Sequence, residues 1–96
     1  MNKTKIEKLL LELGLSPATK GFKYIKDIIL LLDIMPLKTA YREVSKQNNI
    51  TTSELKSCIY SSFELIKNRN INPDFIKELL TDNPVESIYF KLKEGD

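Results

Sequence analysis

Apolar residues recur every three to four positions along almost the whole chain, and short polar breaks divide the pattern into about six segments. This spacing places the apolar side chains along one face of a helix. The breaks carry glycine, asparagine and proline, which are residues that commonly end helices. No alternation of apolar and polar residues lasts long enough to specify a sheet. We therefore expect an all-α fold, a single compact bundle of about six helices, with residues 1–96 forming one domain.

The first two helices are delimited by residues that start or stop a helix. Apolar spacing predicts a first helix over Lys3–Leu13, with Gly14 supplying the left-handed residue at its end. Ser16–Pro17 predicts the cap and the first turn of a second helix, because proline suits the first helical position. Gly21 lacks a side chain and should let another helix approach closely. Met35–Pro36 should end the second helix, since the residue before proline is pushed out of helical geometry.

A short polar hinge separates the third predicted helix from the fourth. The third helix covers Leu37–Gln47, and Asn48–Asn49 ends it because asparagine tolerates the left-handed conformation. Thr51 and Glu54 have the spacing of a capping box, which fixes where the fourth helix begins. Two amphipathic helices joined in this way indicate a helix-turn-helix over about residues 37–69, with the later helix offered to a DNA groove. Its expected buried stripe is Leu55, Cys58, Ile59, Ser62, Phe63 and Ile66.

The last part of the chain predicts two shorter helices. Apolar spacing indicates a fifth helix over Asp74–Thr81 and a last helix over Val85–Lys93, each preceded by an asparagine–proline signal. A strand over Ser87–Leu92, forming a β-wing, is the less favoured alternative.

The composition restricts the classes of function. With no histidine and one cysteine, Cys58, the chain lacks ligands for a zinc site and cannot form an internal disulfide. Acid pairs such as Asp27 and Asp33 have no nucleophile, histidine or phosphate loop beside them, so we expect no enzyme, no catalytic residue, no metal and no cofactor. No apolar run approaches the roughly 20 residues that span a bilayer, and no signal peptide is recognisable. The expectation is a cytoplasmic protein that acts by binding.

The segment Leu13–Ile29 resembles the start of the C-terminal DNA-binding effector domain of the stage-zero sporulation response regulator family. There, a Gly-hydrophobe-Pro turn precedes the pattern Lys-Gly-aromatic-x-Tyr-aliphatic-basic. The matching residues in this first segment are Gly14, Pro17 (one residue later than in the pattern), Lys20, Gly21, Phe22, Tyr24, Ile25 and Lys26. Matching residues in the predicted helix-turn-helix are Asn49, Thr51, Ser53, Ile59, Glu64 and Arg69. The likeness covers nearly the whole chain.

This resemblance implies an all-helical fold whose fourth helix reads the major groove of double-stranded DNA, often as tandem copies. The sequence departs from the family in two respects. A chain that starts at Met1 has no room for a receiver domain, so control by phosphorylation would come through a partner unless the chain is an excised fragment of a longer regulator. The outward arginine and histidine positions of the family correspond here to Glu54, Ser57, Tyr60 and Ser61. Bidentate arginine contacts to guanine are therefore not available from these positions.

Candidate DNA contacts lie on the third and fourth predicted helices. Lys38, Arg42 and Lys46 have the i, i+4, i+8 spacing of one helix face, suited to contacts with the phosphate backbone. The start of the fourth helix offers hydroxyls, free amides and the helix dipole to a phosphate. The full set of expected contacts is Lys38, Arg42, Lys46, Thr51, Thr52, Ser53, Lys56, Ser57, Tyr60, Ser61, Lys67 and Arg69. Lys20 and Lys23 add a second basic edge.

The sequence thus favours a helix-turn-helix DNA-binding protein, a transcriptional regulator acting as a homodimer or a tandem pair. Two alternatives stay open. The chain could be a protein-interaction module that kept the fold, lost its DNA contacts and modulates a full-length regulator. It could also be a plasmid-borne accessory protein that binds DNA at an origin or transfer site. Glu54 supports the first alternative, because a carboxylate is unfavourable near phosphate.

Overall fold

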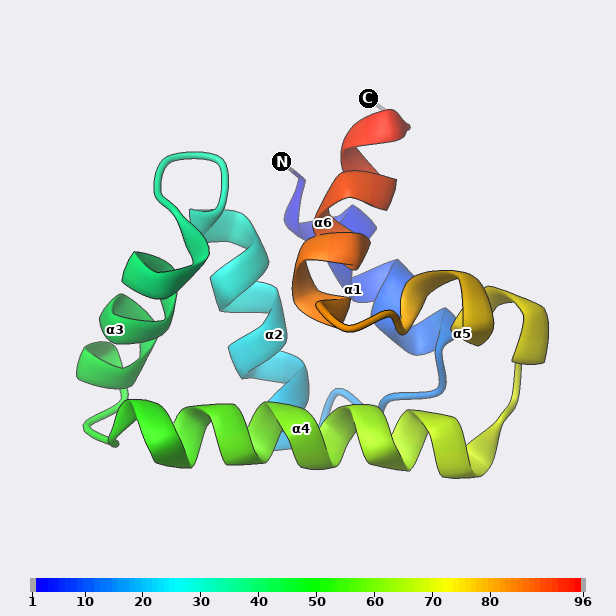
Figure 1. Cartoon of the computed structure of the whole chain (residues 1–96), viewed down its shortest axis with the longest axis horizontal. Helices are drawn as coiled ribbons and strands as arrows, with labels where there is room; N and C mark the ends of the chain where they lie inside the picture. Colours follow the sequence, from blue (N-terminus) through cyan, green and yellow to red (C-terminus); the bar gives the residue numbers. More distant parts are fainter. Residues whose placement is uncertain (1, 96) are drawn as a thin grey trace.

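The structure is a computed structural model that describes residues 2–95, and helices account for most of this range (Figure 1). The helices of residues 2–95 are α1 (Lys3–Glu12), α2 (Lys20–Leu31), α3 (Leu37–Gln47), α4 (Thr52–Arg69), α5 (Pro73–Leu79) and α6 (Pro84–Glu94). No strand occurs within residues 2–95, and the segment considered for a β-wing lies inside α6. The all-α fold predicted from the apolar spacing is confirmed.

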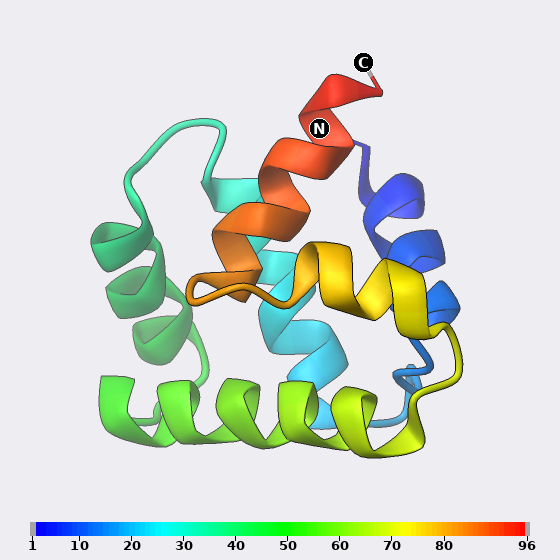
Figure 2. The ribbon, with the colours of Figure 1, turned by 45° about the vertical axis from the view of Figure 1, so that its right-hand side comes forward.

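Helix α2 runs through the middle of the molecule and packs against α1, α3, α4 and α6 (Figures 1 and 2). Ile25, Ile28 and Ile29 have no exposed surface, and Phe22 and Tyr24 are also buried. A helix that is apolar on several faces is stable only when other elements cover those faces. The sequence of α2 therefore explains why α1, α3, α4 and α6 pack around it.

The crossing of α2 and α4 depends on Gly21. A Cβ atom added there would lie 1.7 Å from Oγ of Ser62 and 2.9 Å from its Cβ, far inside van der Waals contact. The Ser62 hydroxyl donates to the Cys58 carbonyl oxygen, 3.0 Å away, so its polar group is satisfied inside the contact. The close approach expected at Gly21 is confirmed, and Ser62 is the residue that it accommodates.

Three helices are followed by a residue in the left-handed conformation, and in each case the residue is a glycine or an asparagine. Gly14, after α1, has φ of 89°, Asn49, after α3, has φ of 54°, and Asn70, after α4, has φ of 49°. Glycine and asparagine are the residues that reach this region at least cost. These local signals are why the boundaries of α1, α3 and α4 agree closely with the predicted ones.

Both predicted ends of the second helix are wrong. Met35–Pro36 was expected to end it, but α2 already ends at Leu31, where the amides of Ile34 and Met35 donate to the Leu31 carbonyl oxygen at 3.0 Å in a turn. Ser16 and Pro17 do not begin α2, because the chain first makes a turn in which the Thr19 amide donates to the Ser16 carbonyl oxygen at 3.1 Å. Pro17 occupies the second position of this turn, where its fixed φ also fits. Thr19 then caps α2, since its hydroxyl oxygen accepts from the Phe22 amide at 3.3 Å. Proline suits both positions, and here the turn is held by local hydrogen bonds, among them the Thr19 hydroxyl donating to the Ser16 carbonyl oxygen at 2.7 Å.

Helix α5 is also shorter than predicted. It ends at Leu79, and the following residues form the connection to α6, in which the Asn83 amide donates to the Thr81 hydroxyl oxygen at 3.4 Å. The Thr81 and Ser87 hydroxyl oxygens lie 2.6 Å apart, so a side chain of this connection is tied to α6 itself. These contacts hold the connection against the start of α6 and compete with one more helical turn.

No helix within residues 2–95 has both the length and the apolar character required to cross a membrane.

Candidate nucleic-acid interface and adjoining groove

Helices α3 and α4 are joined by a tight connection, residues 48–51 (Figures 1 and 2). Asn49 turns the chain in the left-handed conformation, and the Ile50 amide then donates to the Ser45 carbonyl oxygen at 3.0 Å. Ser45 is small and buried, and its hydroxyl donates to the Tyr41 carbonyl oxygen at 2.7 Å. A small, internally satisfied side chain lets the connection fold back against α3. The N-terminal end of α4 is therefore held next to α3.

The start of α4 is fixed by the capping box that the sequence predicted. The Thr51 hydroxyl oxygen accepts from the Glu54 amide at 3.0 Å, and the Glu54 carboxylate accepts from the Thr51 amide at 3.4 Å. The amides of Thr52 and Ser53 are in the first turn, where no intrahelical acceptor exists. They remain suited to a phosphate. The Glu54 carboxylate lies at the same helix end, however, and its charge opposes a second anion there.

Helix α4 presents an exposed stripe of hydroxyl groups. Ser53, Ser57 and Ser61 are all exposed, and their i, i+4, i+8 spacing puts them on one face of the helix. The opposite face holds the buried residues of α4, among them Leu55 and Ile66. Cys58, predicted to be part of the buried stripe, is half-buried at its edge. The predicted division of α4 into an apolar inner face and a short, polar outer face is confirmed.

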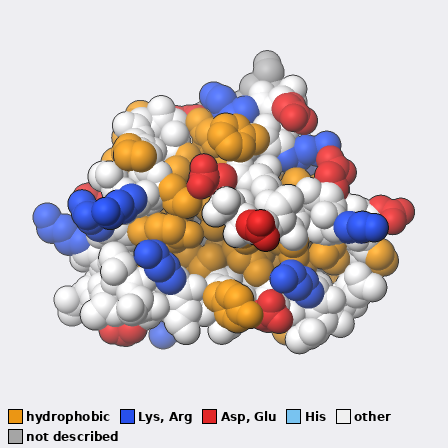
Figure 3. Space-filling model, in the orientation of Figure 1, with side chains coloured by type: hydrophobic (Ala, Val, Ile, Leu, Met, Phe, Trp, Pro, Cys, Tyr) orange, Lys and Arg blue, Asp and Glu red, His pale blue; other side chains and the backbone are white. Residues whose placement is uncertain are grey.

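Helix α3 carries a row of cations that lack acidic partners. Lys38, Arg42 and Lys46 are exposed, and within residues 2–95 none of them forms a salt bridge. Several lysines elsewhere are paired: Lys26 lies 3.6 Å from Glu7, and Lys91 lies 2.9 Å from Glu78. Figure 3 shows Lys and Arg side chains gathered over α3, at the left of the view. The α3 row therefore keeps its positive charge available to an external anion.

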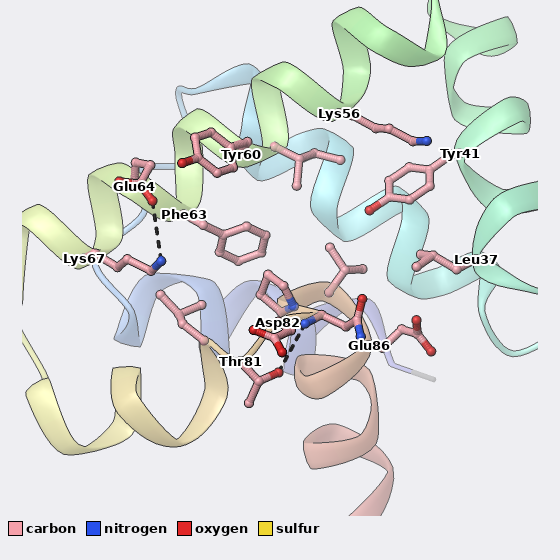
Figure 4. A pocket seen from close by; sticks show the side chains of 15 residues that line it. Leu37, Tyr41, Lys56, Tyr60, Phe63, Glu64, Lys67, Thr81, Asp82 and Glu86 are labelled. Atoms are coloured by element: carbon pink, nitrogen blue, oxygen red, sulfur yellow. Dashed lines mark hydrogen bonds and ion pairs between the residues drawn. The ribbon is translucent and has the colours of Figure 1, made fainter.

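Two further expected contacts, Lys56 and Tyr60, lie on the flank of α4 that faces α6 rather than on the serine stripe (Figure 4). The Lys56 ammonium lies 5.5 Å from the centre of the Tyr41 ring, which is within cation–π distance. Tyr60 is 67% exposed. Its ring is not packed into the core, so it remains available to a ligand.

The charged side chains at the C-terminal end of α4 form contacts within the chain. The Lys67 ammonium lies 3.4 Å from the Glu64 carboxylate of the same helix. Arg69 was expected to reach a phosphate, but its guanidinium donates to the Gly14 carbonyl oxygen at 2.8 Å. That contact ties the end of α4 to the connection between α1 and α2. Among the expected contacts, only Thr52 is half-buried and the others are exposed.

The structure also forms a groove that the sequence did not predict. It has a volume of about 370 Å³ and lies between α3, the flank of α4 and the connection from α5 to α6. Figure 3 shows apolar side chains at the centre of this face, and Figure 4 shows the lining residues. The apolar lining residues are Leu37, Tyr41, Ile59, Phe63, Leu80, Pro84 and Val85. No local pattern could have indicated the groove, because its walls are far apart in the sequence.

One hydroxyl group in the groove stays neutral. Burial raises the pKa of Tyr41, and the nearby carboxylate of Glu86 raises it further. The Tyr41 hydroxyl therefore remains protonated across the physiological pH range and can both donate and accept a hydrogen bond. In Figure 4 it points into the groove, from the α3 side.

Comparison of the chain with protein-family models, with curated proteins and with solved structures gave no match. Within residues 2–95, no three His, Cys, Asp or Glu side chains gather in a way that could hold a metal ion.

Proposed function

We propose that this protein binds double-stranded DNA through a helix-turn-helix formed by α3, residues 48–51 and α4. One observation carries the proposal: the row of Lys38, Arg42 and Lys46 has no acidic partner and adjoins a helix with an exposed polar face. Phosphate neutralisation by such cations supplies most of the sequence-independent affinity for DNA. The likeness of Leu13–Ile29 to sporulation effector domains adds support for a role in transcription regulation.

In this proposal the two helices contribute different parts of the binding. The α3 row contacts the phosphate backbone and fixes the position of the protein, whereas α4 enters the major groove. The serine stripe, Ser53, Ser57 and Ser61, is short enough to let the helix backbone approach the bases. Tyr60 and Lys56 lie on the adjoining flank of α4. Arg69 is left out of the interface, because it holds the Gly14 carbonyl.

The chemistry of α4 implies modest discrimination between DNA sequences. Serine hydroxyls make single hydrogen bonds with either donors or acceptors, so they do not distinguish bases as bidentate arginine, asparagine or glutamine do. We therefore expect affinity to be dominated by charge. If about six phosphates are neutralised, log K should fall with log salt concentration with a slope near −5.

The test compares two triple variants with the same change in net charge. Lys38→Gln/Arg42→Gln/Lys46→Gln removes the α3 row, while Lys3→Gln/Lys8→Gln/Lys77→Gln removes three exposed cations from α1 and α5. Fluorescence anisotropy with a pool of random duplexes at several salt concentrations gives the affinity and the salt slope. The α3 variant should lose about 2 to 3 units of slope, at roughly 0.9 per phosphate contact. The control variant should keep nearly the wild-type slope.

If the two variants lose the same amount of salt slope, DNA binding depends on net charge alone, and the proposed interface is wrong. Absence of duplex binding by the wild-type protein at 50 mM salt would reject DNA binding altogether. A second variant, Tyr60→Ala, separates base contact from anchoring. It should change the preference between duplexes more than the mean affinity, and an equal loss on all duplexes would place base contact elsewhere.

A further inference from the structure

The groove beside α4 has rims of opposite charge that do not neutralise each other. Lys56 stands on the α4 side, and Asp82 and Glu86 stand on the opposite side, on the α5–α6 connection and the first turn of α6. Within residues 2–95 none of these three forms a salt bridge. The opposite charges are therefore held apart, with the groove between them (Figure 4).

The basic rim continues onto α3. Lys38 and Arg42 directly follow the groove residues Leu37 and Tyr41, so they lie about a quarter turn further round the helix. Both are exposed and without an ion pair in the described part of the chain. The α4 side also carries Lys67 and Glu64, which pair with each other at 3.4 Å. The α3–α4 side of the groove therefore has a net positive charge, and the α6 side is negative.

The floor between the rims is apolar. Ile59, Phe63 and Val85 form its closed part, each with 3–4% of its surface exposed. Leu37 and Leu80 are half-buried at its edges. An apolar strip bordered by two oppositely charged rims complements an amphipathic helix whose apolar face has acidic residues along one edge and basic residues along the other.

We propose that this groove docks an amphipathic helix of a partner protein, with acidic residues facing Lys56 and Lys38 and basic residues facing Asp82 and Glu86. The floor and the acidic rim of the groove do not suit nucleic acid, since the apolar floor offers phosphates no partner and the two carboxylates repel them. A bound helix covers Lys56 and Tyr60. It therefore competes with DNA for this flank of α4, a consequence that rests on the proposed function, whereas the docking itself does not.

The test uses three fluorescently labelled 18-residue helical peptides with the same leucine stripe and different edges. One peptide has glutamate along one edge and lysine along the other, the second has glutamate on both edges, and the third has lysine on both. Anisotropy titrations at 150 mM salt, without DNA, give the dissociation constants. The mixed peptide should bind at least about fivefold more tightly than either single-charge peptide, because only it matches both rims.

Charge variants of the rims then assign the binding to this groove. Lys56→Glu weakens the basic rim, which keeps Lys38 and Arg42 on α3, and should shift the preference towards the all-lysine peptide. Glu86→Lys weakens the acidic rim and should favour the all-glutamate peptide. The exchange variant Lys56→Glu/Glu86→Lys should restore the preference for the mixed peptide, which can bind in the reverse direction. Lys77→Glu, an exposed site on α5, is the control and should leave all three affinities unchanged.

Circular dichroism confirms that each variant is folded. Equal affinities for the three peptides, or preferences that rim substitutions leave unchanged, would overturn the proposal. No saturable binding below about 1 mM would do the same. Self-association of the protein that Lys56→Glu abolishes would assign the groove to a second copy of the chain. If the protein binds none of the peptides and Lys56→Glu loses duplex binding, the groove is part of the DNA interface. The docking proposal and the DNA-binding proposal therefore fail in distinguishable ways.

Discussion

Helix α4 makes two kinds of contact along its length. Against α2 it is sealed, because Gly21 brings the backbone of α2 to within contact distance of Ser62. Toward α6 it is open, because Lys56 and Tyr60 line a groove of about 370 Å³ and, among residues 2–95, form no salt bridge with its α6 wall. The difference lies in the side chains. Small residues allow helices to close on each other, whereas long charged residues keep the surfaces apart and leave groups free to bind.

This contrast separates the residues that hold the protein together from those available to a ligand. The buried stripe of α4 and the Gly21 contact supply stability. The serine stripe and the groove flank supply little, since their side chains make few contacts within the described chain. Substitutions on the two sides should therefore affect different measurements, stability on one side and binding on the other.

The largest effect on stability is expected from Gly21→Ala. The added Cβ overlaps Ser62, and overpacking of this kind costs about 2 kcal/mol in the free energy of unfolding. Urea denaturation gives this value from the midpoint and slope. The matched control repeats the substitution in a Ser62→Gly background, where the overlap is absent. There alanine should stabilise by about 1 kcal/mol through its helix propensity, and a change of the same sign in both backgrounds would refute the contact.

A smaller effect is expected from Thr51→Ala. This substitution removes the hydroxyl oxygen that accepts from the Glu54 amide, and losing such a cap costs about 1 kcal/mol. Ser53→Ala is the comparison, because Ser53 is exposed in the same first turn of α4 without a side-chain hydrogen bond among residues 2–95. It should change the free energy of unfolding by less than about 0.5 kcal/mol. Equal losses in thermal denaturation of the two variants would contradict the capping role.

The smallest effects are expected at the groove rims. Lys56→Gln loses an exposed cation–π contact with Tyr41, and Asp82→Asn loses no ion pair within residues 2–95. Each should alter the free energy of unfolding by about 0.5 kcal/mol or less. A loss of about 2 kcal/mol at either position in urea denaturation would show that the rims are structural. The distinction between the sealed and the open side of α4 would then fail.

Local signals predicted most of the helices. Gly14, Asn49 and the Thr51–Glu54 capping box act within a few residues, so their effect does not depend on the rest of the chain. The error at Ser16–Pro17 shows the limit of such signals. Proline fits both the first turn of a helix and the second position of a β-turn, so the presence of proline does not decide between the two.

The candidate site was predicted in part. Helical spacing alone put Lys38, Arg42 and Lys46 on one face, and that face is exposed. The same reasoning placed Arg69 toward a ligand, but Arg69 instead binds the Gly14 carbonyl, a residue far from it in the sequence. Sequence spacing gives the direction of a side chain around its own helix and gives no information about its neighbours on other helices.

For this protein, the sequence by itself determined that the fold is helical, where most of the helices lie and which face of each is apolar, because backbone geometry and side-chain periodicity are properties of short segments. Tertiary structure decided how closely the helices approach and which charges meet a partner. The crossing of α2 and α4, the fixed position of Arg69 and the groove with two charged rims all depend on segments that meet only when the chain is folded.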